Sequence, residues 1–413
     1  MRDVSARFKY SEREFHKAAR RSSSDDSENK PPLATANAAQ GVNEEPVQPD
    51  SCPSRELIHS HIRRYYRDVD TKATTDWEVV SARIRRDLAP YTVLKLGGFS
   101  LGDACTRLLS DVLAHGASKL RTLDLGFNRL TDQGATQLAE ALETNASLES
   151  LYLSGNEIGP AGARALAQVL IKNTHLHSLH LSGNNIGEEG ARFLADGVAG
   201  NTALRALYLG TNGIGTAGMQ SLATALTQNN SLEELTLGQN KVGSEGVRHL
   251  ASAFATGHVA LSTLELGKNG VDQEGAIALA RSLCGVNRLQ NLYMDHNPLG
   301  DVGASAFGAL LAQNTELRVL DLSYTQMSLL GLRELSVSTM EVHVRKVISD
   351  IAKLPFNADE YETLQAYYLG GRCSTGSNGC SDWGIDDVTG EPTPCPACQS
   401  SRLARYRRTM VSL

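Results

Sequence analysis

A motif of about 28 residues repeats through the middle of this 413-residue chain, and it decides what the chain can fold into. The pattern is close to L-x-x-L-x-L-x-x-N, with Met294 in place of one leucine. Its middle leucine recurs in nine successive units between Tyr91 and Met340, and Phe99 and Thr325 occupy the asparagine position in the outermost two. The asparagines of the other seven units are separated by 28, 28, 28, 28, 29 and 28 residues: Asn128, Asn156, Asn184, Asn212, Asn240, Asn269 and Asn297.

The spacing within each unit predicts one short strand and one helix. Leu123 and Leu125 are two residues apart, so both point to one face of a strand, while Asp124 points to the other face. A glycine follows each asparagine by six residues, and apolar residues then recur at helical spacing, as at Ala135 and Leu138. A single unit cannot bury its leucines alone, so we expect the units to stack around one continuous core.

Two sets of asparagines have predicted structural roles. The asparagine of the motif is expected to be buried, with its side-chain amide bonded to backbone groups of the loop after each strand, because a bare buried amide costs about 1–3 kcal/mol. A second set is expected near the helix ends, where asparagine tolerates a left-handed cap: Asn145, Asn173, Asn201, Asn229 and Asn314.

The segments on either side of the repeats have different compositions. Few large apolar side chains occur before the first helical pattern, so that stretch gains little burial on ordering. The predicted organisation is a disordered segment at 1–53, a helical cap at 54–90, the repeat solenoid at 91–340, capping helices at 341–371, and a cysteine-rich segment with a basic tail at 372–413.

Composition excludes several classes of protein. The net charge of −6 and the pI of about 6.0 give no global electrostatic case for a nucleic-acid binder. No apolar run approaches the ~18 residues that span a bilayer, and the first residues lack the apolar stretch of a secretory signal. We therefore expect a protein of the cytoplasm, with the nucleus as the alternative, whose partners are proteins rather than membranes, nucleic acids or small molecules.

The repeats LDLGFNRLTDQGATQLAEAL and LYLSGNEIGPAGARALAQVL resemble leucine-rich repeats of the ribonuclease-inhibitor-like subclass. Ribonuclease inhibitor, the repeat domains of NOD-like receptors and Ran GTPase-activating proteins share that subclass. The resemblance implies an α/β solenoid in the form of a horseshoe, with a parallel sheet inside and helices outside. The nucleotide-binding pattern G-x-x-x-x-G-K-[ST], which NOD-like receptors carry in another module, is absent from the chain.

Strand residues between the leucines should line the concave face, one per repeat. The central column reads Lys95, Asp124, Tyr152, His180, Tyr208, Thr236, Glu265, Tyr293 and Asp321. Aromatic side chains on an open sheet face favour partner binding, and the alternative is that they are ordinary cross-strand pairs that stabilise the sheet. Small residues lie beside these aromatic ones. They either keep the central column accessible to a partner or are required by a tight turn at the end of the strand. The predicted partner-binding residues are Asp124, Tyr152, His180, Tyr208, Glu265, Tyr293, His296 and Tyr324.

Four of the seven cysteines lie close together near the end of the sequence, at Cys373, Cys380, Cys395 and Cys398. The spacing C-x6-C-x14-C-x2-C predicts a structural zinc ion held by four thiolates, although the first gap is wider than usual. The segment has almost no core of its own, so metal binding would supply its folding free energy. A redox-active Cys-x-x-Cys and reduced thiols without structure are the alternatives.

The functional prediction is a non-enzymatic scaffold that binds a protein partner on the concave face, since catalytic motifs such as H-E-x-x-H and G-x-S-x-G are absent. The runner-up is a GTPase-activating protein for a small Ran-like GTPase, which the resemblance suggests and for which Arg129 is the candidate residue. A third class is nucleic-acid association through the cysteine segment and the tail arginines Arg402, Arg405, Arg407 and Arg408.

Overall fold

The computed structural model describes one long stretch of the chain with short gaps. The described residues are 82, 85–114, 119–285, 288–339, 346–348, 384–385 and 392–393. Outside them lie the predicted disorder at 1–53, most of the cap at 54–90, most of the capping helices at 341–371, and the four predicted zinc ligands Cys373, Cys380, Cys395 and Cys398.

Within the described residues, ten short parallel strands follow one another in a single sheet, in the order of the sequence, and the first nine belong to the repeats. Adjacent strands pair so that the middle leucine of one lies beside the middle leucine of the next. The strands of the repeats are β1 (Val93–Lys95), β2 (Thr122–Asp124), β3 (Ser150–Tyr152), β4 (Ser178–His180), β5 (Ala206–Tyr208), β6 (Glu234–Thr236), β7 (Thr263–Glu265), β8 (Asn291–Tyr293) and β9 (Val319–Asp321).

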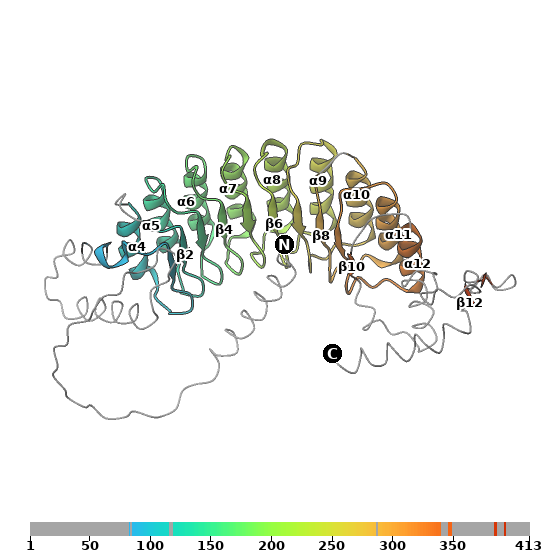
Figure 1. Cartoon of the computed structure of the whole chain (residues 1–413), viewed down its shortest axis with the longest axis horizontal. Helices are drawn as coiled ribbons and strands as arrows, with labels where there is room; N and C mark the ends of the chain where they lie inside the picture. Colours follow the sequence, from blue (N-terminus) through green and yellow to red (C-terminus); the bar gives the residue numbers. More distant parts are fainter. Residues whose placement is uncertain are drawn as a thin grey trace, which may run out of the picture.

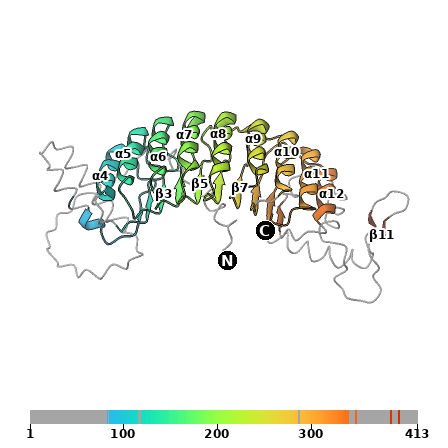
Figure 2. The ribbon, with the colours of Figure 1, turned by 90° about the horizontal axis from the view of Figure 1, so that it is seen from above.

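A helix follows each of these strands, and all the helices lie on the same side of the sheet. Figure 1 shows them along the outer curve of an arc, with the strands along the inner curve, and Figure 2 shows the same two layers from above. The predicted α/β horseshoe is confirmed. The helices are α4 (Asp103–Ala114), α5 (Asp132–Leu142), α6 (Pro160–Leu170), α7 (Gly187–Ala199), α8 (Gly215–Gln228), α9 (Gly243–Ala255), α10 (Gln273–Leu283), α11 (Gly300–Leu311) and α12 (Leu329–Thr339).

One continuous apolar core runs between the two layers, from Leu94 in the first repeat to Leu335 in the last helix. The recurring glycine of the helices from α5 to α12 lets neighbouring helices approach closely. A methyl group at Gly218 would lie 2.6 Å from Cγ2 of Ile214 and 2.9 Å from Cβ of Ala191 in the preceding helix. The glycine of the motif therefore serves helix packing.

The motif asparagines form a ladder of hydrogen bonds inside the solenoid, as predicted. Asn240 Nδ2 donates to the carbonyl oxygens of Leu209 and Leu237, both at 2.8 Å. Its Oδ1 accepts from the backbone N–H of Asn212 at 2.8 Å and of Ile214 at 3.3 Å. Asn212 departs from the pattern, because its Oδ1 is buried without a hydrogen-bond partner among the described residues. Equivalent bonds occur at Asn128, Asn156, Asn184, Asn269 and Asn297.

The second set of asparagines forms another ladder at the ends of the helices. Asn229 Nδ2 donates to the carbonyl oxygens of Val198 at 2.7 Å and Asn201 at 2.8 Å in the preceding repeat. Its Oδ1 accepts from the N–H groups of Ser231 and Leu232 in its own loop. The prediction of a left-handed cap was wrong, because Asn229 is extended, with φ −89° and ψ 128°. Related bonds occur at Asn145, Asn173, Asn201 and Asn314, none of which has positive φ.

Polar side chains also join the starts of neighbouring helices. Asp132, in the first turn of α5, accepts hydrogen bonds at Oδ1 from the N–H groups of Gly159 (2.6 Å) and Gly162 (2.8 Å) at the start of α6. The first N–H groups of a helix have no partner within it, so an acceptor from the preceding repeat stabilises both repeats.

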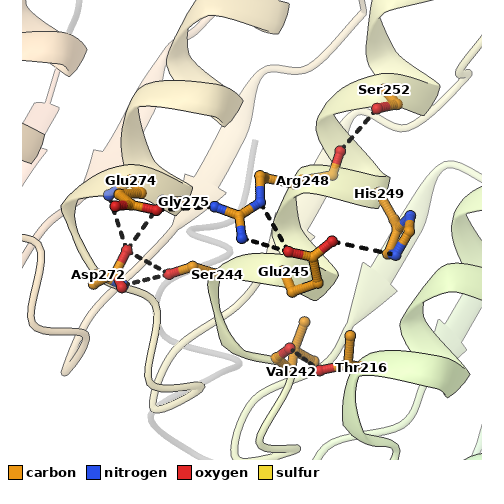
Figure 3. Close-up of polar contacts among 10 residues, drawn as sticks. All are labelled: Thr216, Val242, Ser244, Glu245, Arg248, His249, Ser252, Asp272, Glu274 and Gly275. Atoms are coloured by element: carbon orange, nitrogen blue, oxygen red, sulfur yellow. Dashed lines mark hydrogen bonds and ion pairs between the residues drawn. The ribbon is translucent and has the colours of Figure 1, made fainter.

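Figure 3 shows a variant of this arrangement between α9 and α10. Ser244 donates to Oδ1 of Asp272 at 2.5 Å, and Asp272 caps α10 by accepting from the N–H groups of Glu274 and Gly275. Arg248 pairs with Glu245 in its own helix and with Glu274 of α10, at 3.1 Å for the latter pair. These charged groups are exposed to solvent, so their contacts align the two helices more than they stabilise them.

The C-terminal end of the sheet differs from the prediction. β10 (Lys346–Ile348) pairs in parallel with β9, with Val347 beside Leu320 and Ile348 beside Asp321. A capping helix was predicted there, and at 346–348 that prediction was wrong. β-branched residues favour strands, and the backbone groups along the edge of β9 gain hydrogen-bond partners when a further strand adds to the sheet.

Two further features lie at the ends of the described chain. Residues 85–88 are helical, Leu88 packs against the core, and Arg85 pairs with Asp111 of α4 at 2.9 Å. In the cysteine-rich segment, β11 (Gly384–Ile385) and β12 (Pro392–Thr393) pair antiparallel.

Candidate functional site

The inner face of the sheet carries the side chains between the buried leucines. Leu151, Leu179 and Leu207 are fully buried, so the residue after each of them points to the opposite, inner face. The register places Tyr152 beside His180 and His180 beside Tyr208. The structure therefore brings the predicted column of residues together in the predicted order.

Three aromatic rings of this column stack face to face; we name Tyr152, His180 and Tyr208 the aromatic stack. The ring centroids of Tyr152 and His180 are 3.9 Å apart with an interplanar angle of 14°. Those of His180 and Tyr208 are 4.0 Å apart with an angle of 8°. Each ring is half-buried, because its neighbours in the stack cover its faces while its edge points to the concave side.

Small residues lie on both sides of the aromatic stack. The strand positions two residues before the rings are Ser150, Ser178 and Ala206, and those two residues after are Ser154, Ser182 and Gly210. Side chains two apart in a strand share one face of a sheet. The three rings therefore form a ridge between two rows of small side chains.

The aromatic stack is uncharged at neutral pH. Burial between the two tyrosines lowers the pKa of His180 to about 3, since the charged imidazolium loses water there. A ring nitrogen of His180, Nε2, lies 2.6 Å from the hydroxyl oxygen of Ser178. The ridge thus combines apolar ring surface with the polar tips of two tyrosines.

A second cluster lies further along the same face, over β7 to β9. The rings of His296 and Tyr324 stack at 4.3 Å with an angle of 21°, and Tyr324 is 36% exposed. Nδ1 of His296 lies 2.8 Å from Oδ2 of Asp295. Glu265, Tyr293 and Asp321 are neighbours in the central column. We name the whole set the acidic–aromatic surface: Glu265, Tyr293, Asp295, His296, Asp321 and Tyr324.

The carboxyl groups of the inner face are partly removed from water. Burial raises the pKa of Asp321, and the nearby Asp295 carboxylate raises it further, while hydrogen bonds from Ser323 oppose the shift. Burial also raises the pKa of Asp124, opposed by a hydrogen bond from the N–H of Gly126 and by the charge of Lys95. These carboxyl groups are therefore easier to neutralise than ordinary surface acids.

The small residues beside the central column have a role that the sequence did not reveal. Gly238 and Gly267 do not have positive φ, so a tight turn does not require them. A methyl group at Gly238 would collide with the carboxylate of Glu265, and one at Gly267 would lie 2.5 Å from Oδ1 of Asp295. The glycines therefore leave room for acidic side chains from the next repeat.

Several residues of this face were not among the predicted site residues. Asp295 occupies the otherwise small position after the strand, and Asp321 ends the central column. Phe127 is 38% exposed and lies over Gly155, where any larger residue would collide with its ring. The signal in the sequence was that an aspartate, Asp295, occupies the position after the strand at which the other repeats have a small residue.

Other predicted residues lie away from this face or outside the described chain. Arg129, the candidate for GTPase activation, is an exposed loop residue with φ 59°. Cys284, outside the predicted zinc set, is exposed at the end of α10, because it follows the last buried turn of that helix. Within the described residues, no group of three or more His, Cys, Asp or Glu side chains is arranged to hold a metal ion. None of the helices described there is both long and apolar enough to cross a membrane.

Comparisons with known proteins identify the repeats. A family model described as Leucine Rich repeat matches residues 116–139, 144–167, 172–195, 200–223, 228–251, 261–280 and 289–308. No curated protein sequence matches the chain.

Several solved structures are similar at low sequence identity. The actin-binding site 2 of leiomodin-1 is 20% identical, with a TM-score of 0.32, over 38% of this chain and 90% of that one. The C-terminal domain of tropomodulin from Caenorhabditis elegans is 19% identical, with a TM-score of 0.31, over 37% and 93%. The leucine-rich-repeat-containing protein LegL7 from Legionella pneumophila is 19% identical, with a TM-score of 0.41, over 68% and 92%.

Proposed function

The chain belongs to the leucine-rich-repeat proteins, and from that premise we propose that it is a non-enzymatic scaffold that binds a protein partner on the inner face of its sheet. Solenoids of this kind present extended concave surfaces for binding. The observation that carries the proposal is the aromatic stack of Tyr152, His180 and Tyr208 in the middle of that face.

The chemistry of the stack suits a binding anchor. Tyrosine offers a large contact area with few rotatable bonds, and its hydroxyl can bond a partner at the edge of an interface. The rings are already held by their neighbours, so binding orders little that is free. A stack that served only to stabilise the sheet would contribute about 0.2–1 kcal/mol per pair and would need no ridge between small residues.

The test is a comparison of captured partners between matched variants. The double change Tyr152→Ala and Tyr208→Ala removes two of the rings, while Arg164→Ala and Arg192→Ala remove two exposed arginines near Phe193 on the helical face. Quantitative mass spectrometry should find proteins that the parent and the arginine variant retain equally. The tyrosine variant should lose them, with an affinity about 30-fold lower for a loss of ~2 kcal/mol. Equal recovery by all three proteins would contradict the proposal.

We also propose, on the spacing in the sequence, that Cys373, Cys380, Cys395 and Cys398 hold one structural zinc ion. Four thiolates would leave no open position for water or substrate, and they favour the reducing cytoplasm or nucleus as the site of action. Elemental analysis of the full chain, purified without chelators or a metal-binding tag, should give one zinc per chain. Cys395→Ser should lower that ratio, and four freely reactive thiols without zinc would contradict the assignment.

A further inference from the structure

The acidic–aromatic surface differs in charge from the aromatic stack. From Tyr152 to Thr236 the central column is uncharged, whereas over β7 to β9 it carries Glu265 and Asp321, with Asp295 at the next inward-facing position. At the other end of the column, the carboxylate of Asp124 has a basic neighbour, Lys95 of β1. Lys268 and Arg318 are the basic residues closest to the carboxylates of the acidic–aromatic surface in sequence, each three residues from one of them, and both are exposed. The surface therefore places three carboxylates beside the rings of Tyr293 and of the stacked His296 and Tyr324.

We propose that the acidic–aromatic surface binds an arginine-bearing extended segment of the protein partner, an inference that rests on the function proposed above. Guanidinium groups form paired hydrogen bonds with carboxylates and also stack against aromatic rings. The surface offers both kinds of contact side by side, which a plain acidic patch does not.

The arrangement of the carboxylates supports a cationic occupant. The charge of Asp295 raises the pKa of Asp321, opposed by the charge of His296, so the two carboxylates are near enough to repel each other. Asp295 contacts His296, and Asp321 accepts hydrogen bonds from Ser323. A guanidinium between the two carboxylates would relieve the repulsion in surroundings where burial strengthens the attraction.

The spacing of the strands defines where the apolar and arginine residues should occur along the partner's segment. Adjacent strands lie ~4.8 Å apart, so Glu265 on β7 and Asp321 on β9 are ~10 Å apart along the sheet. His180, at the centre of the aromatic stack, is three strands from Glu265, or ~14 Å. An extended peptide advances ~3.3 Å per residue, and its side chains share one face only when they are an even number of residues apart. One segment crossing the strands would therefore place an apolar side chain four residues before one arginine and eight before a second.

The test uses a fluorescein-labelled peptide with that pattern, F-G-S-G-R-G-S-G-R, and the full chain in an anisotropy titration. We expect binding with a Kd below ~1 mM at low salt, weakened by added salt and abolished in the peptide with both arginines replaced by glutamate. Asp295→Asn with Asp321→Asn should weaken binding by about tenfold or more, since it removes the charge, keeps the shape and leaves one acceptor oxygen on each side chain.

The matched control is Glu140→Gln with Asp196→Asn, which makes the same change in net charge on exposed positions of α5 and α7. It should change the Kd by less than about twofold. Equal weakening by both pairs, or no binding by the parent chain, would overturn the inference. If Tyr152→Ala with Tyr208→Ala weakens partner capture while the aspartate variant leaves it unchanged, the arginine segment is wrong and the proposed function stands. If neither the tyrosine variant nor the aspartate variant changes partner capture, both the proposed function and the arginine-bearing segment are refuted.

Discussion

Two asparagines of the inner ladder should differ in what their removal costs. Asn240 makes five hydrogen bonds: three from Nδ2 to carbonyl oxygens and two from backbone N–H groups to Oδ1. Three of them are 2.8 Å long, and the two of 3.3 Å are weaker and count together as about one. At about 1 kcal/mol per bond, Asn240→Ala should lower the free energy of unfolding by ~4 kcal/mol. The change also leaves the N–H groups of Asn212 and Ile214 buried without an acceptor.

Asn212 lies one repeat earlier and makes only the donor bonds of this set. Its Nδ2 donates to the carbonyls of Leu181 at 2.9 Å and Leu209 at 3.0 Å, and more weakly to that of Gly210 at 3.2 Å, but its Oδ1 is unpaired among the described residues. Asn212→Ala therefore removes about two good bonds and also removes a buried oxygen that lacked a partner, so we expect a loss of ~2 kcal/mol.

The assay is urea unfolding of both variants and the parent, followed by circular dichroism of the helices at equilibrium. The two positions are in adjacent central repeats and are similarly buried, so the difference of ~2 kcal/mol isolates the contacts of Oδ1. The slope m should stay the same in all three proteins. A loss at Asn212 equal to or larger than that at Asn240 would refute the hydrogen-bond account of the ladder.

Two further predictions concern the core and the aromatic stack. Leu207→Ala in the central repeat should cost ~2–5 kcal/mol in urea unfolding, and Leu94→Ala in the first repeat should cost less, because an end repeat can fray; equal losses would contradict stacking through nearest neighbours. The pKa of His180 falls from 6.5 to about 3 on folding. The contribution of the neutral, buried imidazole to the free energy of unfolding is therefore complete above pH 6.5 and is lost as the pH falls toward 3. Between pH 7.5 and pH 5 the parent should lose ~2 kcal/mol more stability than His180→Gln, and identical pH profiles would show that His180 is not desolvated.

The sequence predicted the repeat architecture well because the repeat determines it. The spacing of leucines, asparagines and glycines is periodic, and each of these residues has one place in a stacked unit. Asn229 shows the limit of this reasoning. Its position near a helix end was predicted, but its extended backbone follows from bonds to the preceding repeat, which no pattern within one unit reveals.

The order of the residues along the candidate site was predictable from the sequence, but the contacts between neighbouring repeats were not. The column through Tyr152, His180 and Tyr208 follows from alternation in a strand and from stacking of repeats. The sequence marked Asp295 as an exception among small residues, but not its contacts, since these depend on Gly267 in the neighbouring repeat leaving space for its carboxylate. The strand at 346–348 was missed for a similar reason: the edge of β9 offers partners that a sequence window does not contain.

Site-specific photo-crosslinking tests the central claim, that the concave face binds a protein partner, most directly. Benzoylphenylalanine would replace Tyr208 on the inner face in one protein and Arg192 on α7 in another, both as full-length chains. After irradiation with candidate partners, the account predicts a covalent adduct from position 208 and none from position 192. An adduct from position 192 alone would contradict binding on the concave face and assign the partner to the helices.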